Sequence, residues 1–311
     1  MSVSGREGRD VPSLGLLRTF IALPTPHRSM FESIGRSIEL VKTSGNILME
    51  NKKFLAFPVL SGFVTTIVML TFALPLIFAG IFAGLTTSGS GLFIAILFLF
   101  YAAGYFVVIF FNTALISCVS AHLNGRDMSI GEGLAIASRH LPTILAWALI
   151  SATVGIILHL IERRAGIFGR IATVFIGGVW SLVTFFVLPV LILEDKGVAD
   201  SVRESASLIR KTWGESIVGS GSIMIIFVAI GIVAFFGVLA TLAVGNMIVF
   251  GIALVLFLIL VVVLAVVASA MQGIFVTALY TYARTGVVPS AFNRDLIQHA
   301  FVPKQAGPGN I

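Results

Sequence analysis

The sequence predicts an all-α membrane protein: a bundle of six transmembrane helices with cytoplasmic amphipathic helices lying in the membrane plane. Hydrophobic residues make up 58% and charged residues 11% of the 311 residues, whereas ordinary soluble domains hold about 25% charged residues. Residues 54–121 and 216–283 contain no Asp, Glu, Lys, Arg or His. A bilayer crossing needs about 20 apolar residues, so each run holds more than one span.

The chain divides into a membrane domain with a tail at each end. Residues 1–29 are weakly patterned and contain several glycines and prolines, so we expect a flexible tail. The membrane domain covers 30–303, and a second flexible tail covers 304–311. Met30 is also a candidate start, and one sequence leaves open whether 1–29 is the native N-terminus or an upstream extension.

Six apolar stretches are predicted to cross the membrane. They are 54–85, 92–121, 143–161, 171–193, 216–240 and 246–283. Pro75 is expected to kink the first span, and the fourth is expected to break at Pro189, because proline removes a helical hydrogen bond. The sixth span is overlong, so we expect it to tilt or to project past the headgroups.

A segment with helical spacing of apolar residues precedes each pair of spans. These segments are 30–53, 130–140 and 198–213, and polar or charged side chains occupy their other faces. Ser-Ile-Gly recurs at 33–35 and 129–131, and Pro-Val-Leu at 58–60 and 189–191. We therefore hypothesise three repeats of one interfacial helix and one helical hairpin; chance recurrence is the alternative.

The positive charges predict the orientation. Six spans place both termini on one side, and only Arg163, Arg164 and Arg170 of the 20 Lys and Arg residues fall on the other. Lys and Arg are enriched on the cytoplasmic side of membrane proteins. Both termini are therefore expected in the cytoplasm. The net charge of +6 follows from this placement and does not predict a nucleic-acid partner.

The sequence offers little for catalysis. It contains no P-loop, no GxGxxG after a strand, no HExxH and no GxSxG, so we expect no enzyme and no cofactor. His159 and Glu162 lie one helical turn apart, but two ligands do not make a metal site, and no metal is predicted. Cys118 is the only cysteine, which excludes an intramolecular disulfide.

Polar side chains within the spans are candidate site residues. Asn112, Thr113 and Gln272 lie deep in apolar stretches, where an amide or hydroxyl needs a partner. They predict either hydrogen bonds between helices or a polar translocation path. Glu194 and Asp195 follow the span that contains Pro189. They are candidates for receiving a cation or proton, and the alternative is that they begin the next helix.

Basic residues beside the spans predict contacts with anionic lipid headgroups, so membrane lipids are the expected partner. Each such side chain contributes about 1 kcal/mol near an anionic surface. The candidates are Lys52, Lys53, Arg203, Arg210 and Lys211.

Four segments resemble a family of uncharacterised prokaryotic integral membrane proteins. They are FVVIFFNTALISCVSAHLNG (106–125), WALISATVGIILHLIE (147–162), WSLVTFFVLPVLILED (180–195) and SASLIRKTWGE (205–215). The likeness extends over 30–303 and implies a six-helix protein of a bacterial or archaeal cytoplasmic membrane. A proline-containing span followed by Glu and a basic helix is more distantly similar to membrane domains attached to glycerophosphodiester phosphodiesterases. No part matches their catalytic domain, so no activity is implied.

Two functions fit these features. The first is transport or binding of a small or amphiphilic molecule, which the kinked spans and buried amides favour. The alternative is a scaffold or accessory protein whose interfacial helices organise lipids or a cytoplasmic partner. An enzyme with an intramembrane site is a third and weaker reading. The substrate, the transport direction and the oligomeric state stay open.

Overall fold

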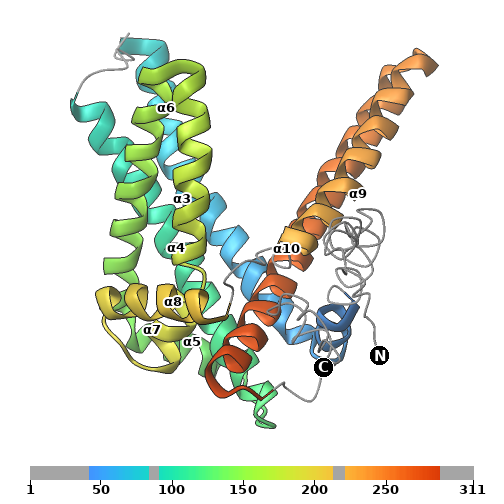
Figure 1. The fold of residues 1–311 in the computed structure, drawn as a ribbon. Helices are drawn as coiled ribbons and strands as arrows, with labels where there is room; N and C mark the ends of the chain where they lie inside the picture. The colour runs from blue at the N-terminus through green and yellow to red at the C-terminus, as the bar shows by residue number, and fades with distance from the viewer. Residues whose placement is uncertain (1–41, 84–90, 213–220, 288–311) are drawn as a thin grey trace, which may run out of the picture.

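The computed structural model describes residues 42–83, 91–212 and 221–287, and every regular element in these ranges is a helix (Figure 1). The predicted all-α class is thus confirmed. Six segments are long and apolar enough to cross a membrane, as predicted: Lys52–Leu74, Ile94–Leu123, Leu141–Glu162, Gly169–Leu193, Ile226–Ala243 and Met247–Thr285. The tails 1–29 and 304–311 lie outside the described residues.

The helices that contain the first two spans match the predicted limits, 54–85 and 92–121, to within two residues. A helix over 42–50 leads through the short η1 (Lys52–Leu55) into α3 (Ala56–Ala83). Helix α4 (Gly91–Leu123) returns alongside α3. Both helices are apolar on all sides. A helix satisfies its own backbone hydrogen bonds, so an apolar helix of this kind can face lipid.

Helix α5 (Ile130–Arg139) begins at a reciprocal cap. The Ser129 hydroxyl accepts a hydrogen bond from the Glu132 backbone N–H at 3.2 Å, and Glu132 Oε2 accepts one from the Ser129 N–H at 2.7 Å. This short amphipathic helix packs against α4. Its predicted limits, 130–140, are confirmed.

Helix α6 (Leu141–Val183) contains the third span and most of the fourth. The two are separated at Gly166, whose backbone angles are φ 54° and ψ −131°. A side chain would strain this conformation, so glycine suits the reversal. Figure 1 shows α6 folded back on itself at this point.

The fourth span breaks earlier than predicted. The helix ends at Val183, a turn follows over 184–186, and α7 (Val187–Leu193) then begins. Pro189 lies in the first turn of α7, where a missing N–H is tolerated because no helical partner exists for it. The freed N–H of Phe186 donates instead to the Ser205 hydroxyl of α8 (Val198–Thr212) at 3.0 Å.

Helices α9 (Gly221–Ala240) and α10 (Met247–Thr285) form the last hairpin, joined by η2 (Thr241–Val244). Figure 1 shows this hairpin leaning away from the other spans while α8 lies across one end of the bundle. We call this end, which holds η1, α5, α8 and the last turns of α10, the basal end. Only the second half of α10, from Ala270 on, carries its buried residues.

The apolar core lies toward the basal end. Its largest fully buried side chains are Phe54, Phe57, Leu115, Val119, Ile144, Phe186, Leu191, Ile274, Phe275 and Leu279. Elsewhere the spans expose large apolar side chains, which suits a lipid environment. The order of elements, one short helix before each hairpin, fits the three-repeat hypothesis; superposition of the three units stays a prediction.

Candidate functional site

A cavity of about 560 Å³ lies between α3, α4 and α10, and we call it the α3–α4–α10 cavity. Its volume falls in the usual range for small-molecule sites, about 300–1,000 Å³. It is lined by Phe57, Pro58, Val59, Ser61, Gly62, Phe63, Thr65, Thr66, Val108, Phe111, Asn112, Val262, Ala265, Val266 and Ser269.

The cavity opens to the side of the bundle. Val59, Phe63 and Val262 line it and are 52%, 66% and 62% exposed. Two of these residues belong to α3 and one to α10, so the opening lies where these helices diverge. In Figure 1, α10 runs away from the other spans above the basal end. A molecule dissolved in the surrounding lipid could enter by this route.

Asn112 brings a polar side chain to the lining of this cavity. Its predicted role, in a hydrogen bond between helices or in a translocation path, stays a prediction. Its half-buried side chain makes no hydrogen bond among the described residues. Thr113, its neighbour, is fully buried and points elsewhere, with a hydroxyl that finds no partner in the described chain. Gln272 is half-buried on α10 and does not line the cavity. The structure therefore brings Asn112 together with Thr65 and Ser269 rather than with Gln272.

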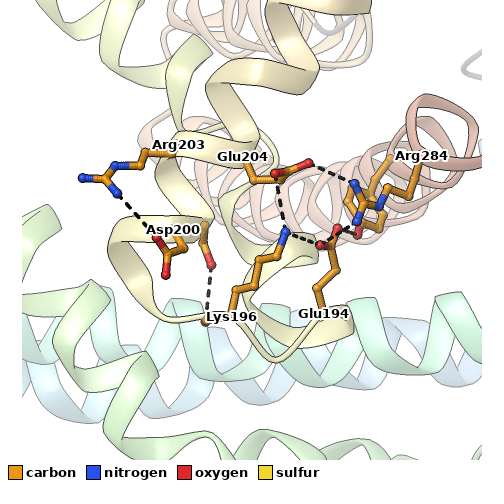
Figure 2. Close-up of polar contacts among 8 residues, drawn as sticks. Glu194, Lys196, Asp200, Arg203, Glu204 and Arg284 are labelled. Carbon is orange, nitrogen blue, oxygen red and sulfur yellow. Dashed lines mark hydrogen bonds and ion pairs between the residues drawn. The ribbon is translucent and has the colours of Figure 1, made fainter.

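A cluster of ionised side chains joins α7, α8 and α10 at the basal end (Figure 2). We call it the Glu194 cluster: Glu194, Lys196, Glu204, Tyr280 and Arg284. Arg284 donates to Glu194 Oε2 at 3.0 Å and to Glu204 Oε1 at 2.9 Å. Lys196 Nζ lies 2.7 Å from Glu194 Oε2 and 3.4 Å from Glu204 Oε2. The Tyr280 hydroxyl donates to Glu194 Oε1 at 2.5 Å.

The charges of this cluster balance, because two carboxylates face two cations. The Glu194 side chain is only 12% exposed. Burial alone would raise the pKa of Glu194, but the hydrogen bonds from Lys196 and Tyr280 and the charge of Arg284 outweigh it. The pKa of Glu194 therefore lies below its ordinary value. The hydrogen bond to Glu194 likewise raises the pKa of Lys196.

Glu194 and Asp195 therefore occupy different surroundings. Asp195 adopts a left-handed backbone conformation, with φ 50°, and its carboxylate lies 3.3 Å from His140 Nε2. Helix α8 begins at Val198, so neither carboxylate lies in its first turn. Three protein groups, from Lys196, Tyr280 and Arg284, pair with the Glu194 carboxylate. Whether either carboxylate receives a cation or proton stays a prediction.

The predicted headgroup contacts divide into paired and free side chains. Lys53 forms an ion pair with Asp127 and lowers the pKa of that carboxyl through a hydrogen bond, so it joins η1 to the α4–α5 loop. Lys52 and Arg210 are exposed. Arg203 lies 3.7 Å from Asp200, and both side chains are largely exposed (Figure 2). Lys211 lies in α8, and its side chain is outside the described set.

A second, polar cavity of about 450 Å³ lies at the basal end. It is lined by Thr43, Asn46, Ile47, Glu50, His122, Leu123 and Gly125. His122 Nε2 lies 3.3 Å from the Asn51 side-chain nitrogen. Among the described residues no three His, Cys, Asp or Glu side chains are placed to hold a metal ion.

Sequence reasoning missed Thr65, Ser269, Tyr280 and Arg284. Hydroxyls are common in transmembrane helices, so the first two carried no distinguishing signal. Arg284 ends the long charge-free run on α10, and Glu194 ends the run on the fourth span. These opposite charges at the ends of two apolar spans were the one signal in the sequence that α10 and the fourth span could meet at this end.

A comparison with protein families found a match. A model described as "Family of unknown function (DUF6159)" matches residues 91–290. This range begins with α4 and includes all of α10, so it contains the whole Glu194 cluster and two of the three cavity walls. The predicted resemblance to an uncharacterised family is confirmed. A search of curated proteins found no match.

Proposed function

Since the chain belongs to this family of unknown function, its role has to be inferred from its own residues, and we propose that it binds an amphiphilic molecule within the cytoplasmic membrane of a prokaryote. The α3–α4–α10 cavity is the observation that carries this proposal. The cavity combines mostly apolar walls with the unpaired amide of Asn112. Such a lining suits a ligand that is largely hydrocarbon and carries a polar group.

The side opening supports a ligand that arrives from the bilayer. Its rim consists of exposed apolar side chains, which lipid tails would surround. A hydrophobic molecule entering between α3 and α10 would stay in an apolar medium throughout. Transport would require a further step that carries the ligand across the membrane or out of it.

The proposed orientation places the basal end in the cytoplasm, and both termini with it. Lys52, Arg203 and Arg210 are exposed at this end, whereas Arg170 lies near the opposite end, beside the Gly166 reversal. The positive-inside tendency favours this arrangement. Anionic headgroups of the inner leaflet would then meet the exposed basic side chains.

A scaffold function is the second candidate. Helix α8 lies across the basal end with Arg203 and Arg210 exposed, and the Glu194 cluster fixes it to α10. A rigid basic surface of this kind could dock an acidic partner or organise lipids. A scaffold of this type would not need Asn112, so substitution of that residue separates the two functions.

Native mass spectrometry of the purified protein tests the binding proposal. We expect the wild-type protein to retain a lipid-like species that Asn112→Leu largely loses. Asn124→Leu is a matched control, because the Asn124 amide donates to the Ser120 carbonyl oxygen and does not line the cavity. Equal retention by all three proteins would remove the cavity from the function and favour the scaffold.

A further inference from the structure

Three residues with uncharged polar side chains line the α3–α4–α10 cavity, one from each helix. They are Thr65 on α3, Asn112 on α4 and Ser269 on α10. No side-chain hydrogen bond from any of the three is found within the described residues. Each can both donate and accept a hydrogen bond.

Thr65 is the most informative of these groups. Its Oγ1 is buried and has no partner in the described chain. Nearby threonines on the same helix satisfy themselves: Thr66 donates to the Gly62 carbonyl at 2.8 Å, and Thr71 to the Ile67 carbonyl at 2.9 Å. A buried hydroxyl without a partner costs free energy. Ser44 and Thr113 also have buried hydroxyls without a partner in the described chain, but of the three only Thr65 is named among the residues that line the cavity. A ligand in the cavity could supply its missing bond.

None of the described residues that line the cavity has an ionisable side chain. A charged ligand group would leave water without meeting an opposite charge, which is strongly unfavourable. A hydroxyl, ester or amide would lose far less solvation and could pair with Thr65, Asn112 and Ser269. The lining therefore favours an uncharged polar group.

The depth of the cavity leads to the same conclusion. Thr65 lies nine residues into α3 and Asn112 eleven residues before the end of α4, or about 14 and 16 Å at 1.5 Å per residue. The hydrocarbon core of a bilayer is about 30 Å thick. Measured from these helix ends, both groups lie about half that thickness along their helices, which favours an uncharged partner.

The volume suits a ligand with one hydrocarbon chain in the cavity. A group the size of a water molecule fills about 30 Å³, so about 560 Å³ holds roughly eighteen such groups. This is enough for one hydrocarbon chain with its polar end.

We infer that the α3–α4–α10 cavity takes a single-chain amphiphile whose polar group is uncharged and forms hydrogen bonds with Thr65, Asn112 and Ser269. This inference rests on the proposed function and adds the ligand class. It is independent of whether the ligand is only bound or also moved.

Photolabelling of the full chain in detergent tests the inference. Three diazirine probes with the same sixteen-carbon chain are compared: the alcohol, the alkyl phosphate and the alkyl trimethylammonium. We expect the alcohol to label peptides of α3, α4 or α10. Thr65→Val and Asn112→Leu should each lower this labelling about five- to tenfold, the loss expected for one hydrogen bond to a buried group.

Thr71→Val is the matched control, because it removes the same hydroxyl from α3 outside the cavity. Thr65→Val is nearly isosteric, and each variant is first checked for an unchanged melting temperature. One contrary result is that the phosphate or ammonium probe labels the protein as strongly as the alcohol or more strongly, and that this labelling still needs Asn112. That result would overturn the uncharged class of ligand and keep the proposed function. Absence of labelling by all three probes, or labelling unchanged in both cavity variants, would overturn both.

Discussion

Arg284, near the end of α10, donates a 3.0 Å hydrogen bond to Glu194, which lies 90 residues earlier in the chain between α7 and α8. The same guanidinium donates to Glu204 of α8 at 2.9 Å. The last span is thereby fixed to the broken fourth span and to the surface helix. Since α10 also forms one wall of the α3–α4–α10 cavity, this contact helps to set where that wall lies.

Arg284→Gln should destabilise the protein. Glu194 is 12% exposed and would lose one of its two cations, while the 45% exposure of Arg284 limits the cost. We expect a loss of about 1–2 kcal/mol in the free energy of unfolding, at the low end for a buried pair. Thermal unfolding in detergent measures it. Arg203→Gln is the control and should cost less than about 1 kcal/mol, because its pair with Asp200 is exposed; equal losses would contradict the role of burial.

The stability contributed by Glu194 should depend on pH. Its pKa is lower in the folded protein than the ordinary 4.5, so its ionised form stabilises the fold above that value. This contribution is lost as the pH falls through the lower folded pKa. We expect the difference in melting temperature between wild type and Glu194→Gln to be largest near neutral pH and to shrink below about pH 4.5.

The comparison with Glu194→Gln is needed because Asp127 and Glu132 also have lowered pKa values and titrate in the same acidic range. Both carboxyls are present in the two proteins, so their effects cancel in the difference. A difference in melting temperature that stays constant from pH 7 to pH 3 would show that the charge of Glu194 does not stabilise the fold.

The positions of the spans could be predicted because they depend on local composition. Long charge-free runs between basic segments gave α3 and α4 to within two residues. Another local signal, the helical spacing of apolar residues, predicted α5, which begins at the cap formed by Ser129 and Glu132. Bilayer thickness and the need to satisfy the backbone constrain these elements before any tertiary contact forms.

The sites could not be predicted in the same way because their residues come from distant segments. Tyr280 and Glu194 are 86 residues apart, and no local pattern pairs them. The cavity combines α3, α4 and α10. Thr65 and Thr66 are neighbours of the same residue type, but only the Thr66 hydroxyl has a partner in the described chain. The break before Pro189 likewise depends on Ser205 of α8, which supplies the hydrogen bond that stabilises it.

Gly133→Ala should weaken the packing of α5 on α4. A Cβ at this position would lie 2.5 Å from Cys118 Sγ and 3.0 Å from the Ala114 carbonyl oxygen. The backbone oxygen cannot rotate away, so we expect a loss of about 1–3 kcal/mol from overpacking. Gly131→Ala is the control, because open space surrounds that position. It should be neutral or stabilising by up to about 1 kcal/mol; a similar loss in both would exclude the steric explanation.

The orientation can be tested with single cysteines, because Cys118, the only native cysteine, is buried. Arg170 and Arg203 are 78% and 83% exposed near opposite ends of the bundle, so a cysteine at either position should react readily. With the basal end in the cytoplasm, a membrane-impermeant maleimide should label Arg170→Cys in intact cells and Arg203→Cys only after permeabilisation. The reverse pattern would place the exposed basic side chains outside and contradict the positive-inside argument. Labelling of both in intact cells would mean that these ends do not lie on opposite sides of a membrane.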